Sequence, residues 1–82
     1  MGDVESPILR AIRNSNPMLV SELIRQGADI NERFGEYEET LLHAAVSENQ
    51  YATVQLLLIE NIQLIDLPDS RGRTPLMIGL VL

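Results

Sequence analysis

The stretch Thr40-Leu41-Leu42-His43-Ala44-Ala45 decides the fold of this chain, because related stretches stand at equal distances on both sides of it. Ser6-Pro7-Ile8-Leu9 lies 34 positions earlier, and Thr74-Pro75-Leu76-Met77 lies 34 positions later. The register continues beyond these stretches, since Val20 aligns with Val54. One period therefore covers nearly all of the 82 residues. A fixed period of this length indicates a repeat architecture.

Each period predicts two helices joined by a short polar turn and followed by a loop. The Ser or Thr that begins each stretch can accept a hydrogen bond from an unpaired amide at a helix start. The proline that follows in the first and third units suits the first helical position. Apolar residues with the spacing of one helix face come next in the second helices: Leu19, Val20, Leu23 and Ile24, then Val54, Leu57 and Leu58. Gly27 and Asn61 are expected to end these helices in the left-handed conformation.

The motifs Thr40 to Ala45, Thr74-Pro75-Leu76 and Gly27-Ala28-Asp29-Ile30-Asn31 resemble the ankyrin repeat, with its Thr-Pro-Leu-His-x-Ala signature in about 33 residues. The resemblance implies one domain over residues 1–82, all-α by content, built as a solenoid of stacked helix-turn-helix units with projecting hairpin loops. The repeats span approximately residues 3–35, 36–69 and 70–82. The last is incomplete, which gives about two and a half repeats. The first unit has Arg10 and Ile12 beside positions that are alanines in the family, and atypical terminal units commonly act as caps.

The third unit ends within its first predicted helix, at Met77-Ile78-Gly79-Leu80-Val81-Leu82. An apolar helix without a partner helix leaves a hydrophobic face in water, whereas terminal repeats ordinarily need a polar outer face. Three explanations are open. The chain is a fragment or isoform of a longer array, or a partner or self-association covers this end, or Leu80 and Leu82 turn inward so that the helix is itself the cap.

Composition narrows the classes of partner. Twelve acidic and six basic residues give a formal net charge of −6, and every basic residue is an arginine. This balance argues against nucleic acid, because phosphate binding needs a basic surface, and against anionic membranes. The absence of cysteine excludes disulfides and thiolate metal sites, and a cytoplasmic or nuclear location is predicted. Met1-Gly2 with Ser6 matches an N-myristoylation pattern, but the neighbouring Asp3 and Glu5 favour Ser6 as a helix cap only.

Nothing in the residue inventory predicts catalysis, a metal or a cofactor. The single histidine, His43, would need an activated nucleophile and an orienting carboxylate, and Thr40 three positions earlier offers only a hydrogen-bonding pair. In ankyrin-like repeats the matching histidine is structural and links its own turn to the neighbouring unit. The glutamates at 36, 38 and 39 lie in a predicted loop, where carboxyl groups are not held at a fixed separation. The chain is therefore not expected to be an enzyme.

The resemblance implies that a partner protein binds to the loops and the first helices, which together line a concave surface. The predicted contact residues come from both units and from the loop between them: Arg10, Arg13, Asn14, Glu32, Arg33, Phe34, Glu36, Tyr37, Glu38, Glu39, Ala44, Ser47, Glu48 and Asn49. The loop, residues 31–39, holds two of the three aromatic residues among four glutamates. Aromatic residues are common at binding hot spots, and carboxylates orient a basic partner. The alternative is that Phe34 or Tyr37 only folds back on the neighbouring helix.

Overall fold

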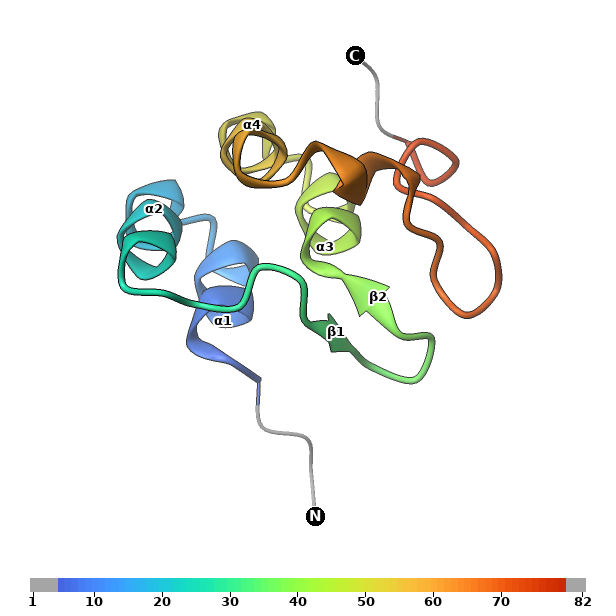
Figure 1. The fold of residues 1–82 in the computed structure, drawn as a ribbon, viewed down its shortest axis with the longest axis horizontal. Coiled ribbons are helices and arrows are strands. Elements are labelled where there is room, and N and C mark those ends of the chain that lie inside the picture. Colours follow the sequence, from blue (N-terminus) through green and yellow to red (C-terminus); the bar gives the residue numbers. More distant parts are fainter. Residues whose placement is uncertain (1–4, 80–82) are drawn as a thin grey trace.

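The fold consists of two stacked helix pairs joined by a hairpin, as shown by a computed structural model that describes residues 5–79 (Figure 1). Helices α1 (Pro7–Arg13) and α2 (Pro17–Arg25) form the first pair. The hairpin of β1 (Arg33–Phe34) and β2 (Glu39–Thr40) leads into the second pair, α3 (Leu41–Ser47) and α4 (Tyr51–Glu60), and the short 3-10 helix η1 (Ile62–Asp66) follows. Helix α1 packs on α3, and α2 packs on α4. The predicted helical solenoid is confirmed.

The predicted N-caps of α1 and α3 are formed, and the third predicted cap makes its hydrogen bond ahead of a turn. The Ser6 hydroxyl accepts a hydrogen bond from the Leu9 amide at 3.2 Å, and Thr40 accepts one from the amide of His43 at 3.3 Å. The Thr74 hydroxyl accepts one from the amide of Met77 at 3.4 Å. The Ser6 and Thr40 caps each satisfy one of the amides that a helix start leaves without a backbone partner, and each contributes about 1 kcal/mol.

The 34-residue period is visible in the backbone as well as in the motifs. Ser15 and Asn49 lie 34 positions apart, each in the turn that follows a first helix, and their φ angles are +56° and +57°. Gly27 ends α2 with a φ of +95°, as predicted. Asn61, its counterpart, does not adopt the left-handed conformation. Its φ is −154°, because its side chain caps the 3-10 helix η1 by accepting a hydrogen bond from the amide of Gln63. The prediction that Asn61 ends the helix is confirmed, whereas its predicted left-handed conformation was wrong.

The third unit differs from the helix predicted over Met77–Leu82. Residues 75–79 form a turn and no α-helix. The amide of Met77 donates to the carbonyl of Thr74 at 3.0 Å, but Gly79 has a φ of +127°, which an α-helix does not contain. The residues Leu80 to Leu82 of the inward-turning alternative lie outside the described residues, as does the Met1-Gly2 pair of the lipidation pattern.

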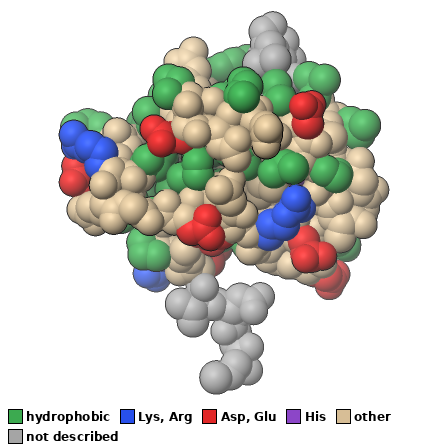
Figure 2. All heavy atoms as spheres, viewed as in Figure 1, with side chains coloured by type: hydrophobic (Ala, Val, Ile, Leu, Met, Phe, Trp, Pro, Cys, Tyr) green, Lys and Arg blue, Asp and Glu red, His purple; other side chains and the backbone are tan. Residues whose placement is uncertain are grey.

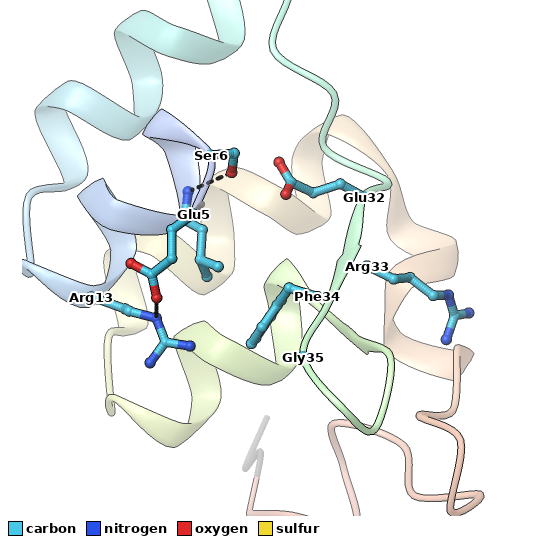
Figure 3. A pocket seen from close by; sticks show the side chains of 8 residues that line it. Glu5, Ser6, Arg13, Glu32, Arg33, Phe34 and Gly35 are labelled. Carbon is cyan, nitrogen blue, oxygen red and sulfur yellow. Dashed lines mark hydrogen bonds and ion pairs between the residues drawn. The ribbon is translucent and has the colours of Figure 1, made fainter. Parts of the chain in front are cut away.

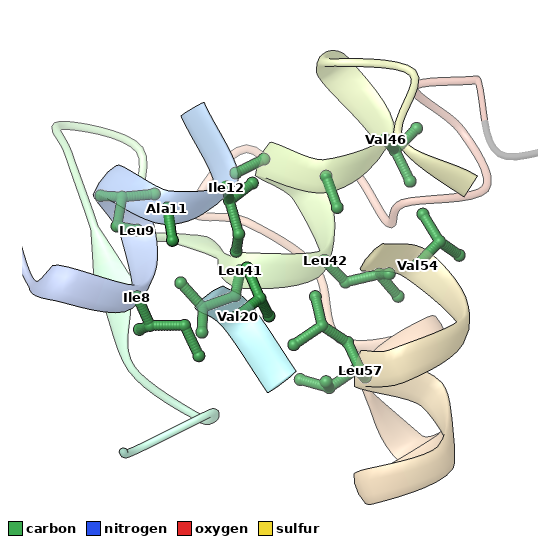
Figure 4. Packing of buried hydrophobic residues seen from close by; sticks show 13 residues of the cluster. Ile8, Leu9, Ala11, Ile12, Val20, Leu41, Leu42, Val46, Val54 and Leu57 are labelled. Carbon is green, nitrogen blue, oxygen red and sulfur yellow. The ribbon is translucent and has the colours of Figure 1, made fainter. Parts of the chain in front are cut away.

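The core lies between the first and the second helices and is continuous across both units (Figure 4). Its largest fully buried aliphatic members come from α1, α3, α4 and η1: Ile8, Leu9, Ile12, Leu41, Leu42, Leu57 and Leu64. Burying each such side chain contributes about 1.5–3 kcal/mol relative to leaving it in water. Neither helix pair could bury its apolar side alone, so the two pairs depend on each other for a core.

Candidate functional site

The loop between the helix pairs is a two-stranded hairpin, which we call the first finger (residues 31–39). Arg33 pairs with Thr40 and Phe34 pairs with Glu39 in antiparallel register. Gly35 has a φ of +76°, and the chain reverses where the amide of Glu38 donates to the carbonyl of Gly35 at 3.3 Å. Left-handed backbone of this kind favours glycine, which pays no steric cost there. The predicted projecting hairpin is therefore present between the two units.

The first finger is tied to the equivalent segment of the next unit, the second finger (residues 67–73). The Arg33 guanidinium donates to the carbonyl of Glu38 at 3.1 Å and to that of Pro68 at 2.6 Å. The amide of Ser70 donates to the carbonyl of Tyr37 at 2.7 Å. The Arg71 guanidinium lies over the Tyr37 ring, 3.6 Å from its centroid. These contacts make the two fingers one continuous surface.

His43 anchors the second finger to α3. Its Nδ1 accepts a hydrogen bond from the Thr40 amide at 3.1 Å, which leaves the proton on Nε2. Nε2 then donates to the carbonyl of Arg73 at 2.7 Å. Both ring nitrogens of this fully buried histidine are thus occupied within the fold. The predicted structural link from its own turn to the neighbouring unit is confirmed.

Asp69 organises the backbone of the second finger. One carboxylate oxygen accepts hydrogen bonds from the amides of Arg71 and Arg73, each at 2.9 Å, and the other accepts one from the Arg73 side chain at 3.2 Å. The hydrogen bond from the Arg73 amide favours the charged form of the Asp69 carboxyl group. It is the main reason why the pKa of Asp69 lies below its ordinary value.

Helix α1 and the first finger enclose a pocket of about 360 Å³ (Figure 3). The Arg13 guanidinium lies 5.3 Å from the centroid of the Phe34 ring, and its Nε forms an ion pair with Glu5 at 2.6 Å. Phe34 is half-buried and packs against the core. Tyr37 is half-buried as well, beneath Arg71. Phe34 therefore follows the fold-back alternative, whereas Tyr37 packs under an arginine of the second finger and not on a helix.

The carboxylates of the first finger form no ion pair within the part of the chain that the structure describes. Glu36 and Glu38 are exposed at the tip, whereas Glu32 and Glu39 are half-buried. Within residues 5–79, none of these four carboxylates lies within ion-pair distance of an arginine. The side chain of Arg33, the one cation of this finger, is directed to backbone carbonyls. The finger thus presents negative charge to solvent.

The remaining predicted contact residues are not all gathered at the pocket. Arg13 reaches the first finger, whereas Arg10 and Asn14 line a separate pocket beside the α1–α2 turn. The exposed residues Ser47, Glu48 and Asn49 lie at the end of α3 and in the turn after it. Ala44 is buried and presents no surface, so the prediction for Ala44 was wrong.

Two residues of the site were missed from the sequence. Arg71 stands 34 positions after Tyr37, so the repeat register could have placed the two at the same position of adjacent fingers. Glu5, the partner of Arg13, precedes the first motif, and no sequence pattern points to it.

Two further classes of site are absent from the described residues. In residues 5–79 no group of three or more histidine, aspartate or glutamate side chains is arranged to hold a metal ion. No helix in this part of the chain is long and apolar enough to cross a membrane.

Comparison with known proteins agrees with this geometry. The family model for ankyrin repeats (three copies) matches residues 8–81. A Rickettsia bellii protein named as an ankyrin repeat protein is 32% identical over 74 residues, which cover 90% of this chain and 10% of the relative. A Danio rerio protein that carries the name palmitoyltransferase ZDHHC13 is 37% identical over 79 residues, which cover 95% of this chain and 12% of that protein. The chain thus spans about a tenth of the length of these relatives.

Proposed function

This chain belongs to the ankyrin-repeat family, whose repeats are generally protein–protein interaction modules, and we propose that it is a non-catalytic adaptor that binds its partner through the first finger and the first helices. The observation that carries the proposal is the pair of exposed carboxylates at the tip of the first finger, Glu36 and Glu38. Hydrogen bonds from Arg33 and from the Ser70 amide join this finger to the second finger, so binding does not have to order the hairpin itself.

The partner is a protein with a basic segment. The four glutamates of the first finger outnumber its one arginine, and the whole chain carries a formal net charge of −6. Charge of one sign around a site steers an oppositely charged partner and orients it on arrival. The pocket beside Phe34 is lined by charged as well as apolar residues, and Arg13 lies over the ring. A Lys- or Arg-containing segment fits the acidic tip of the finger.

The test uses peptides selected by wild-type protein from a random peptide display library, followed by fluorescence anisotropy. The variant Glu36→Gln with Glu38→Gln removes two exposed charges and keeps the shape of the finger. Each exposed ion pair contributes about 0.2–1 kcal/mol, so the affinity should fall about 2- to 30-fold. Glu60→Gln, at the exposed end of α4, is the matched control and should leave the affinity unchanged.

The composition of the selected peptides supplies a second criterion. Enrichment in lysine or arginine, together with weaker binding at high salt, is the expected result. Neutral or acidic peptides, or equal affinity for the wild type and the Glu36→Gln, Glu38→Gln variant, would refute the basic-partner proposal.

A second candidate function is a structural end-piece that caps an array or self-associates. It is favoured by the exposure of Leu76 and Met77 in the third unit. Sedimentation equilibrium decides between the two, because an average mass that rises with concentration supports self-association. A monomer over the whole concentration range supports the adaptor.

A further inference from the structure

The two fingers differ in charge at equivalent repeat positions. The 34-residue period aligns Tyr37 with Arg71 and Glu39 with Arg73. Both arginines of the second finger are exposed. Asp69, the acidic residue of that finger, is buried, and its carboxylate oxygens accept hydrogen bonds within the finger. The second finger therefore presents positive charge to solvent, whereas the tip of the first finger presents negative charge.

The opposite charges lie side by side on the molecule. Figure 2 shows a basic and an acidic group of side chains next to each other at the lower right, where Figure 1 has the hairpin and the second finger. Arg33 brings a further cation to the second finger, because its guanidinium donates to the carbonyl of Pro68 at 2.6 Å. A segment that crosses both fingers therefore meets negative charge on one and positive charge on the other.

The ring of Tyr37 holds the side chain of Arg71. The Arg71 guanidinium lies over this ring, 3.6 Å from its centroid, and a cation in this position is attracted by the electrons of the ring. The amide of Ser70 donates to the Tyr37 carbonyl at 2.7 Å, so the backbone joins the fingers at the same place. The guanidinium is thus positioned before a partner arrives, which lowers the ordering cost of binding.

The guanidinium of Arg71 is suited to bind an oxyanion. It has five N–H donors in a planar fork, which match the oxygens of a carboxylate or a phosphate group. Within residues 5–79 the hydrogen bond donated by Arg71 comes from its backbone amide, to Asp69, and the arginine ion pairs involve other arginines. The donors of the Arg71 side chain are therefore not used by the described part of the fold.

The chain contains a complete example of the same arrangement. Arg13 lies over the ring of Phe34, 5.3 Å from its centroid, and its Nε forms an ion pair with the Glu5 carboxylate at 2.6 Å (Figure 3). Arg71 lies closer to its own ring, but no carboxylate of residues 5–79 is within ion-pair distance of it. Glu5 supplies the anion at Arg13, and the described residues supply none at Arg71.

We propose that Arg71, stacked on Tyr37, binds a carboxylate side chain of the partner protein. The inference rests on the proposed function and makes it more specific, because the partner segment carries an aspartate or glutamate beside its basic residues. The basic residues face Glu36 and Glu38, and the acidic residue faces Arg71. A uniformly basic segment would place a cation against Arg71, so this arginine also discriminates against such partners.

A carboxylate suits this position better than a phosphate group. A guanidinium binds both, but a phosphorylated side chain carries a charge of about −1.5 to −2 at pH 7. Glu36 and Glu38 lie on the adjoining finger, and the whole chain has a formal net charge of −6. Repulsion between like charges therefore acts more strongly on the phosphate than on the singly charged carboxylate.

The test uses the random peptide display library and compares two selections. Wild-type protein should enrich aspartate or glutamate together with lysine or arginine, whereas Arg71→Gln should keep the basic enrichment and lose the acidic one. In a peptide selected by the wild type, replacing the acidic residue with glutamine should weaken binding about 2- to 5-fold in fluorescence anisotropy, as one exposed ion pair gives. The same replacement should not change binding to Arg71→Gln.

A charge reversal separates recognition from a role in bracing the fingers. Arg71→Glu should bind a peptide that carries lysine in place of its acidic residue more tightly than the parent peptide, which a purely structural contact would not produce. Arg25→Gln removes one exposed positive charge from α2 and is the matched control, with affinity unchanged. The peptide substitution measured on the wild type keeps the test valid if a variant loses its fold by circular dichroism.

Three results would overturn the inference: selected peptides without acidic residues, an equal loss for the wild type and Arg71→Gln when the acidic residue is replaced, or no rescue of Arg71→Glu by the lysine peptide. Tighter binding of a peptide with phosphoserine at the acidic position would mean that phosphate is the ligand. If Glu36→Gln with Glu38→Gln weakens binding while Arg71→Gln does not, this inference alone fails. Selected peptides without basic residues would refute the proposed function, and this inference with it.

Discussion

Replacing His43 with leucine should detach the second finger from α3 while leaving the helix packing in place. The His43 ring connects the amide of Thr40 to the carbonyl of Arg73 through its two nitrogens. Leucine is the residue that the first unit has at the same repeat position, Leu9, where it is buried. The substitution therefore suits the local backbone and changes mainly the two hydrogen bonds.

The expected loss follows from the Thr40 amide, which leucine leaves without its His43 partner, because the Arg73 carbonyl still accepts a hydrogen bond from the Asp69 amide at 2.8 Å. A buried amide that loses its hydrogen bond costs about 1–3 kcal/mol, and the lost hydrogen bond to Arg73 adds about 0.5–1.5 kcal/mol. The added apolar burial of leucine offsets part of this cost, which leaves a net loss of about 1–3 kcal/mol. Small domains have a total free energy of unfolding of about 5–15 kcal/mol. A loss of 2 kcal/mol lowers the urea midpoint by roughly 1–2 M at the slopes usual for small domains.

The assay combines urea unfolding with amide hydrogen exchange. The amides of Ser70 and Arg73 should exchange faster in His43→Leu, whereas the amide of Arg10 in α1 should change only with global stability. Leu57→Ala is the matched control, because it destabilises the helix packing by a cavity and leaves the His43 bridge intact. Unchanged stability of His43→Leu, or protection of Ser70 and Arg73 that matches the Leu57→Ala control, would refute the proposed anchor.

Three further predictions concern the core, a turn and the acid response. Leu57→Ala should lower the free energy of unfolding by about 2–5 kcal/mol, as measured in urea, since Leu57 is fully buried between the helices. Gly27→Ala should lower the free energy of unfolding by about 1–2 kcal/mol in thermal or urea unfolding. The cause is the φ of +95° alone, because a Cβ at this position meets no atom within 4 Å. A loss near zero would contradict the left-handed conformation of Gly27. The pKa of Asp69 in the folded chain lies below its ordinary value of 3.8, so the charged carboxylate stabilises the fold at pH values above 3.8. This stabilisation is lost as the pH falls through the pKa of the folded chain. In Asp69→Asn the free energy of unfolding should therefore fall less steeply with decreasing pH below about pH 4. A fall as steep as that of the wild type would show that other carboxyl groups cause the acid response.

Much of the local structure was predictable because it depends on residues a few positions apart. A serine or threonine accepts a hydrogen bond from the amide three residues later in each of the three units, and in the first two it caps a helix. Gly27 adopts the left-handed conformation as glycine does at helix ends. His43 was expected to link two units, and its hydrogen bonds do so.

The failures arose where a residue had a competing use. Asn61 was expected to end α4 in the left-handed conformation, but its side chain caps η1 and its backbone is extended. The apolar run after Thr74 was expected to form a helix, yet residues 75–79 form a turn. A short helix is stable only when packing supports it, and within the described residues no second helix lies over this segment.

The sequence by itself determined the repeat, the caps, the helix pairs and the family, because these follow from periodic burial and from hydrogen bonds between near neighbours. The tertiary structure alone decided how the fingers are used. Arg13 covers Phe34 and Arg71 covers Tyr37, so the aromatic rings brace the hairpins while the carboxylates of the first finger face solvent. These features depend on which side chains meet when one unit is stacked on the next, and that meeting is set by the packing of helices rather than by distance along the chain.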